Sequence, residues 1–166
     1  MMHGAAEDQI QTILDEADAN LIRACPALAQ GAKAEDFTFN MVFQVQLVDV
    51  VNHVEKHGWN PRFVREAECA PVGDPDCVGT IFIVPGQDAV GYQVVVPEER
   101  GQVEVWATLP DMHAARRYVA KVMMRRQWAR WNMRFLKKRP ELRAPGQKLL
   151  EIFKLPVGMT QADFAD

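Results

Sequence analysis

The sequence predicts a mixed α+β fold in which helices accompany a small antiparallel sheet. Apolar residues recur at three- and four-residue steps over residues 5–23, 35–57 and 111–138, which is typical of helices. Short apolar or alternating runs lie between residues 62 and 109, separated by turn-forming residues, as expected of strands. Short connections favour antiparallel neighbours. We therefore expect two N-terminal helices, an antiparallel three- to four-stranded meander, one long basic C-terminal helix and a short terminal helix.

The two predicted N-terminal helices differ in pattern. Residues 5–23 combine an apolar face with several acidic residues, and Pro26 ends the pattern. Residues 35–57 alternate at first, as a strand would, but share one helical face from Phe43 onward. A strand of 23 residues would be far too long, so we predict a helix that ends before Gly58.

The predicted strands are four short runs, at residues 62–69, 78–84, 92–96 and 103–109. The second run is apolar on both faces, which indicates a central strand. The fourth alternates apolar and polar residues, which indicates a strand with one buried side. Residues 149–155 then predict a short helix after the long basic one.

The long helix at residues 111–138 is the most regular element of the sequence. Asp111 suits the N-cap position, because its carboxylate can accept from free amides of the first turn. No proline or glycine interrupts the run before Pro140. Basic residues crowd its C-terminal end, where cations meet the negative end of the helix dipole.

This helix carries two apolar stripes, whereas a surface helix needs only one. The first stripe consists of Ala115, Tyr118, Val122, Ala129, Met133 and Leu136, and the second of Met124, Trp128, Trp131 and Phe135. Either both stripes are core, or the second meets a partner, since aromatic residues rimmed by arginine resemble an interface hot spot. The predicted partner-binding residues are Met124, Trp128, Trp131, Phe135, Arg117, Arg125, Arg130 and Arg134.

Charge is unevenly distributed along the chain, although the net charge is only -3. Residues 112–148 hold 12 Lys or Arg and one acidic residue, Glu141, whereas the remainder holds 7 basic and 21 acidic residues. Such asymmetry is typical of a binding surface for acidic partners or nucleic acid, or of two parts that neutralise each other within one fold. We favour neutralisation, because the acidic remainder would repel an approaching polyanion.

The sequence also bounds the class of protein. Its 166 residues are enough for one domain, and we expect a single domain over 1–166 with a flexible tail at 158–166. The first residues show neither a basic nor an apolar signal region, and no apolar run would cross a bilayer. We therefore expect a cytoplasmic protein with no membrane segment and with free cysteines.

One weaker pattern suggests a metal site. His53 and His57 stand four residues apart, with Asp49 one turn earlier, so these ligand types share a helix face. Cys69 and Cys77 would complete a zinc site, although their spacing is wider than usual. The same two cysteines would face each other across a hairpin, which suggests a reversible disulfide as an alternative to two unpaired thiols.

Three functions remain open. The first is a small non-catalytic interaction protein, an accessory subunit, assembly factor or regulator, that uses residues 111–138 to bind a protein partner or a second copy. The second is single-stranded nucleic-acid binding through the same helix, with phosphate contacts from its basic residues and base stacking on Trp128 and Trp131. The third is a metal- or ligand-binding enzyme that uses Asp49, His53 and His57, with zinc as its cofactor. The first needs no cofactor, and we prefer it because the sequence contains no phosphate-binding loop or nucleophile motif.

Overall fold

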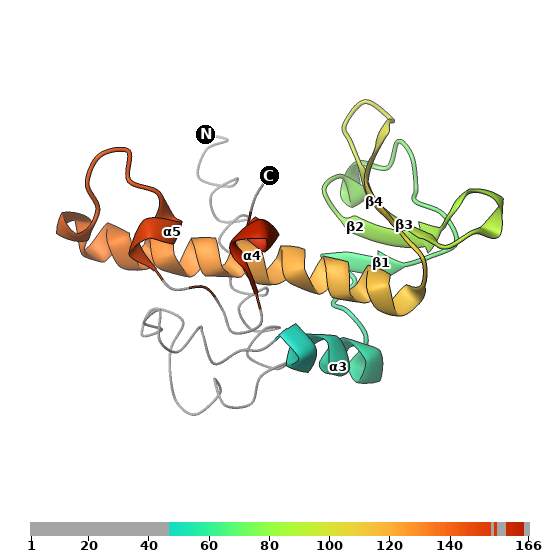
Figure 1. The fold of residues 1–166 in the computed structure, drawn as a ribbon. Helices are drawn as coiled ribbons and strands as arrows, with labels where there is room; N and C mark the ends of the chain where they lie inside the picture. The colour runs from blue at the N-terminus through green and yellow to red at the C-terminus, as the bar shows by residue number, and fades with distance from the viewer. Residues whose placement is uncertain (1–46, 154, 156–158, 165–166) are drawn as a thin grey trace. The chain divides into compact units, whose positions relative to one another are not determined.

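The structure, a computed structural model, describes residues 47–153, 155 and 159–164 (Figure 1). The predicted helix at residues 5–23 and the first part of the one at 35–57 lie outside these ranges. The described residues combine helices with a four-stranded sheet, which confirms the α+β class.

The chain forms two compact units. In the described part of the chain, one unit contains residues 47–52 and the residues from Lys121 onward, and the other contains His53–Ala120. Helices α3 (Leu47–His57) and α4 (Met112–Lys138) each run from one unit into the other. The sequence predicted one domain with no linker, and each unit is described separately below.

The sheet lies in the unit formed by residues 53–120. Its strands are β1 (Val64–Glu66), β2 (Ile81–Pro85), β3 (Tyr92–Pro97) and β4 (Val103–Leu109), in the order β1-β2-β3-β4. Strand β3 pairs antiparallel with both β2 and β4, which confirms the predicted antiparallel meander for these three strands.

Strand β1 corrects the prediction of an entirely antiparallel meander. It runs parallel to β2, with Val64 opposite Ile81 and Glu66 opposite Ile83. Parallel neighbours need a crossover of about a dozen residues or more. Residues 67–80, with the 3₁₀ helix η3 (Pro75–Cys77), provide that crossover and return the chain to the start of β2. The two-strand hairpin expected at this point is therefore not formed.

Strand β2 forms the centre of the sheet, as its apolar sequence predicted. Ile81, Phe82, Ile83 and Val84 are all buried. Since successive side chains of a strand point to opposite faces, both faces of the sheet are covered at β2. On one face, Phe82 and Val84 form a core cluster together with Cys77 and Val95, against which Ala67, Ala70 and Val103 pack.

A β-bulge changes the expected alternation of β4. Val94 pairs with Ala107 and Val95 pairs with Val105, so Trp106 is an extra residue in the ladder. Val105, which the alternation placed on the buried side, is consequently 53% exposed, while Trp106 is half-buried. The bulge thus explains why simple period-two reasoning failed in this strand.

The turn between β2 and β3 is tight and closes on two glycines. The amide of Gly86 donates to the carbonyl oxygen of Gly91 at 2.9 Å. Between them, Asp88 and Ala89 adopt φ angles of 58° and 59°, the left-handed region that residues with a Cβ rarely enter. A Cβ at Gly86 would collide with the carbonyl oxygen of Val90, and one at Gly91 with that of Leu109, so both positions of this turn favour glycine.

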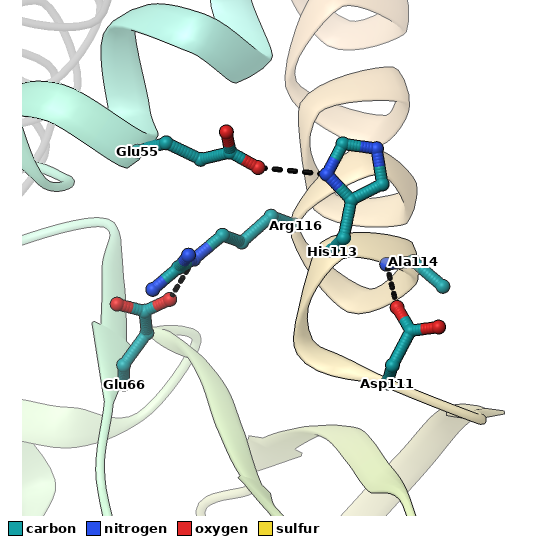
Figure 2. Close-up of polar contacts among 6 residues, drawn as sticks. All are labelled: Glu55, Glu66, Asp111, His113, Ala114 and Arg116. Carbon is teal, nitrogen blue, oxygen red and sulfur yellow. Dashed lines mark hydrogen bonds and ion pairs between the residues drawn. The ribbon is translucent and has the colours of Figure 1, made fainter.

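Helix α4 begins as the sequence predicted. Asp111 Oδ1 accepts a hydrogen bond from the amide of Ala114 at 2.7 Å, which is the N-cap contact (Figure 2). Two polar side-chain contacts then join the first turns of α4 to other elements of the same unit. His113 Nδ1 lies 2.7 Å from Glu55 Oε1 on α3, and Arg116 Nε lies 2.5 Å from Glu66 Oε1 on β1 (Figure 2). The hydrogen bond to Glu66 raises the pKa of Arg116, which therefore stays charged.

Helix α3 confirms the helical reading of the second half of residues 35–57. Its buried residues are Leu47, Val50, Val51 and Val54, which recur at helical spacing. The helix ends at His57, where Gly58 has a φ of 78° and donates its amide to the carbonyl of Val54 at 2.7 Å. Glycine in this left-handed position is a common helix end.

The other unit is built on the second part of α4. After α4 the chain passes through the 3₁₀ helix η5 (Pro140–Leu142) and turns back, and α5 (Leu149–Ile152) lies beside α4 (Figure 1). Just after α5, the ring of Phe153 meets that of Trp128 edge-on, with centroids 6.5 Å apart. Both residues are buried, so this aromatic pair is part of the core.

The described C-terminal residues 159–164 contact this unit, within the stretch where the sequence predicted a flexible tail. Met159 is 6% exposed, and Lys121 Nζ lies 2.9 Å from Asp163 Oδ1 in the 3₁₀ helix η6 (Gln161–Phe164). Burial raises the pKa of Asp163, but hydrogen bonds from Thr160 and Lys121 outweigh it, so the net shift is downward. The buried side chain of Met159 and the ion pair between Lys121 and Asp163 attach this segment to the unit.

Asn132 is a buried polar residue within the apolar part of this unit. Its side chain is 2% exposed, and its amide nitrogen has no hydrogen-bond acceptor within the described part of the chain. An unsatisfied buried donor costs about 1–3 kcal/mol.

We therefore expect Asn132→Leu, which keeps the number and branching of side-chain heavy atoms, to raise the free energy of unfolding by about 1–3 kcal/mol. Denaturant unfolding followed by circular dichroism measures this change. Asn132→Ala is the control, because it removes the amide but leaves a cavity, and it should not stabilise the protein. A loss of stability in Asn132→Leu would show that the amide has a partner.

Candidate partner-binding groove

A groove of about 690 Å³ opens at the C-terminal end of α4, within the unit formed by residues from 121 onward. One wall is α4 itself, and the other is the loop that follows it. The described lining residues are Arg130, Met133, Leu136, Lys137, Pro140, Arg143, Ala144, Pro145 and Gly146. We refer to this feature as the α4 groove.

The lining of the α4 groove is mainly apolar. Met133 is 46% exposed, which is high for an apolar side chain on a helix, whereas Leu136 is 5% exposed. Pro140, Ala144 and Pro145 line it from the loop. Large apolar residues left partly exposed beside a concave surface mark places where a ligand or partner binds.

The loop wall is held by hydrogen bonds along its length. Arg143 Nε donates to the carbonyl of Gln147 at 2.8 Å, and the amide of Ala144 donates to Gln147 Oε1 at 3.1 Å. The amide of Gln147 donates in turn to the carbonyl of Ala144 at 3.0 Å. Arg143 also reaches back to α4, where Nη1 lies 3.3 Å from Met133 Sδ. The groove is therefore preformed, which reduces the conformational entropy that the loop would lose when a partner binds.

The charged residues of the lining are all cationic: Arg130, Lys137 and Arg143. The one acidic residue in this stretch of sequence, Glu141, pairs with Arg139, whose Nε lies 2.6 Å from Glu141 Oε1. That hydrogen bond lowers the pKa of Glu141, which stays ionised and offsets the charge of Arg139. The rim of the groove consequently keeps a local excess of positive charge.

Further arginines continue this positive region along α4. Burial lowers the pKa of Arg126, and the neighbouring charges of Arg130 and Arg125 lower it further. An arginine remains protonated at neutral pH despite such shifts. Three arginines within six residues of one helix repel one another.

The predicted aromatic stripe is not an exposed patch where the structure describes it. Met124 and Trp128 are each 3% exposed, which supports the core alternative for these two residues. The physical reason is that the chain turns back after α4 and packs Phe153 against Trp128. The side chains of Trp131, Arg134 and Phe135 lie outside the described part of the structure. Arg117 is exposed but belongs to the other unit, while Arg125 and Arg130 are half-buried.

The predicted metal ligands are only partly brought together. The rings of His53 and His57 lie side by side, with centroids 4.7 Å apart, as the four-residue spacing predicted. Across the described residues, however, no group of three or more His, Cys, Asp or Glu side chains is placed to hold a metal ion. Asp49 is exposed on α3.

Cys69 and Cys77 do not form the disulfide that was the alternative to two unpaired thiols. Both are free thiols; Cys69 is exposed and Cys77 is buried. The parallel course of β1 and β2 removes the hairpin that would have placed them face to face. Burial and the Asp74 carboxylate, 3.6 Å from Sγ, raise the pKa of Cys77, which disfavours its thiolate form.

Sequence reasoning missed most of the α4 groove, because its second wall is a loop. Met133 lies in a stripe that was expected to be core, and Arg143 and Pro145 belong to no helical or strand pattern. Two prolines and a glycine close together after the long helix were the available signal of a shaped loop.

Comparison with known proteins does not identify a family. No family model, no curated protein and no solved structure gives a significant match to this chain. None of the helices in the described residues is long and apolar enough to cross a membrane. Function is therefore argued from the groove itself.

Proposed function

We propose that the chain is a small non-catalytic interaction protein, an accessory subunit, assembly factor or regulator, that binds a protein partner through the α4 groove. The observation that carries this proposal is a preformed apolar groove that leaves Met133 46% exposed. Flexible thioether side chains such as methionine suit adaptable contact surfaces. Methionine and arginine are both enriched at protein interfaces.

The composition of the groove supports binding rather than catalysis. Its described lining contains no Asp, Glu, His, Cys or Ser side chain, and Lys137, the one residue there of a usual nucleophile or base type, has no second such group beside it in that lining. The sequence-based hypothesis placed the contact surface on the stripe that contains Trp128. We now propose the face of the same helix that contains Met133. Self-association through this groove is a special case of the same proposal.

We expect Met133→Glu to reduce partner binding at least about tenfold, because a charge would enter the apolar floor of the groove. The measurement is quantitative mass spectrometry of the proteins that co-purify with the tagged chain from the cells that produce it. Val90→Glu is the matched control, since Val90 is 72% exposed and lies in the other unit. Sizing of the purified chain detects the case in which the partner is a second copy.

The proposal is contradicted if both variants, each folded by circular dichroism, retain the same partners in the same amounts. If Met133→Glu alone loses a partner, the α4 groove is its binding site.

A further inference from the structure

We infer that the partner of the α4 groove presents a short acidic, amphipathic segment. One face of this segment inserts apolar side chains against Met133 and Leu136, and its carboxylates lie against Lys137 and Arg143. This inference rests on the proposed function and names the chemistry of the partner.

Charge complementarity is the main argument. The groove combines an apolar floor with the cationic side chains of Lys137 and Arg143, and the nearby Glu141 is already paired with Arg139. A neutral apolar partner would leave Lys137 and Arg143 beside an apolar surface without counter-charges, which is unfavourable. A basic partner would be repelled. An acidic amphipathic segment would place apolar side chains against the floor of the groove and pair its carboxylates with the cations at the rim.

Arg143 is the best placed of these cations for binding a carboxylate. Its Nε donates to the carbonyl of Gln147 and its Nη1 lies against Met133 Sδ, so the guanidinium is held in one orientation at the groove wall. A guanidinium that is fixed in this way loses little further entropy when it binds a carboxylate. Lys137 is exposed on α4 and adds a second charge on the helix side of the groove.

The size of the groove fits a peptide segment. A volume of about 690 Å³ lies within the range of about 300–1,000 Å³ that is usual for sites that take small ligands. Amphipathic segments that bind such grooves insert a few apolar side chains spaced three or four residues apart. Their polar faces remain at the rim, where the cations of this groove lie.

A nucleic acid fits the groove less well than an acidic peptide. Sequence-independent binding of single strands depends on aromatic side chains on which bases stack. The described lining contains no aromatic ring, and Trp128 is buried against Phe153. The cationic rim would attract phosphates, but the apolar residues of the floor would offer no ring on which a base could stack.

Peptide selection on the purified full chain tests the inference. A library of random displayed peptides of about twelve residues is selected on the wild-type chain, with Met133→Glu as a competitor in solution to remove peptides that bind elsewhere. We expect the recovered peptides to be net acidic and to carry at least one large apolar residue. Their affinity should fall at least about tenfold with Lys137→Glu and should weaken with added salt.

Arg117→Glu is the matched control for charge, because Arg117 is also exposed on α4 but lies in the other unit. This variant changes the net charge by the same amount and should leave peptide affinity unchanged. A labelled dT20 oligonucleotide is measured in parallel on all variants.

The outcomes separate the inference from the proposed function. Recovered peptides that depend on Met133 but show no acidic bias, or are unaffected by Lys137→Glu, overturn the inference and leave the proposed function standing. Recovery of no peptide that depends on Met133 contradicts the proposed function as well. Tight dT20 binding that is lost with Lys137→Glu would show that the groove binds a nucleic acid rather than an acidic peptide.

Discussion

Replacement of Trp128 by alanine is expected to lower the free energy of unfolding by about 3–5 kcal/mol, the usual cost of removing a buried aromatic ring. Trp128 is 3% exposed and packs edge-on against Phe153. The substitution would leave a cavity beside α4 and remove the contact that holds the returning chain. Since single domains are stable by only about 5–15 kcal/mol, much of the protein would unfold or lose this unit.

Denaturant unfolding measured by circular dichroism and fluorescence tests this expectation. Trp128→Phe retains a ring and should cost much less, while Met133→Ala on the same helix should change stability by less than about 1 kcal/mol, because Met133 is 46% exposed. A Trp128→Ala variant as stable as wild type would mean that Trp128 is not core, and the aromatic stripe would again be the first candidate for a partner surface.

Gly91→Ala is expected to destabilise the sheet by about 3 kcal/mol or more, from two separate effects. Gly91 has a φ of 65°, which costs about 1–2 kcal/mol for a residue with a Cβ. In addition, a Cβ at this position would lie 2.4 Å from the carbonyl oxygen of Leu109, which is backbone at the end of β4. The turn is joined to the strand by the pairing of Tyr92 with Leu109, which opposes a shift that would relieve this approach.

Gly73→Ala separates the two effects. Gly73 has a φ of 83°, but a Cβ there meets nothing within 4 Å, so only the backbone cost of about 1–2 kcal/mol applies. Thermal unfolding of both variants gives the comparison. Equal losses for Gly73→Ala and Gly91→Ala would show that the close approach to Leu109 is relieved by a small shift.

Local signals in the sequence predicted much of the described fold. Asp111 caps α4 because an N-cap depends only on the residues of the first turn, and the end of α3 at Gly58 depends on the local left-handed turn. The apolar sequence of β2 indicated its central place. Strand direction was not predictable in the same way, because β1 runs parallel to β2 through a crossover that no short-range pattern encodes.

The candidate site was less predictable than the fold. Helical spacing placed Met124 and Trp128 on one stripe, but which stripe of α4 is covered depends on where the chain returns after Pro140. Phe153, which lies far along the chain, covers Trp128, and the loop around Arg143 and Gln147 leaves Met133 exposed. These are tertiary contacts, and periodicity alone cannot distinguish an apolar stripe that is packed from one that is open.

Site-specific photo-crosslinking from position 133 tests the central claim, that the α4 groove is the contact surface, most directly. A photoreactive phenylalanine analogue replaces Met133 in one variant and Arg117 in another, since both positions are exposed on α4. After illumination of the cells that produce the chain, we expect a discrete adduct from position 133, weakened by Lys137→Glu, and none of the same size from position 117. The same adduct from both positions, or no adduct from position 133, would contradict the assignment of the groove as the binding site.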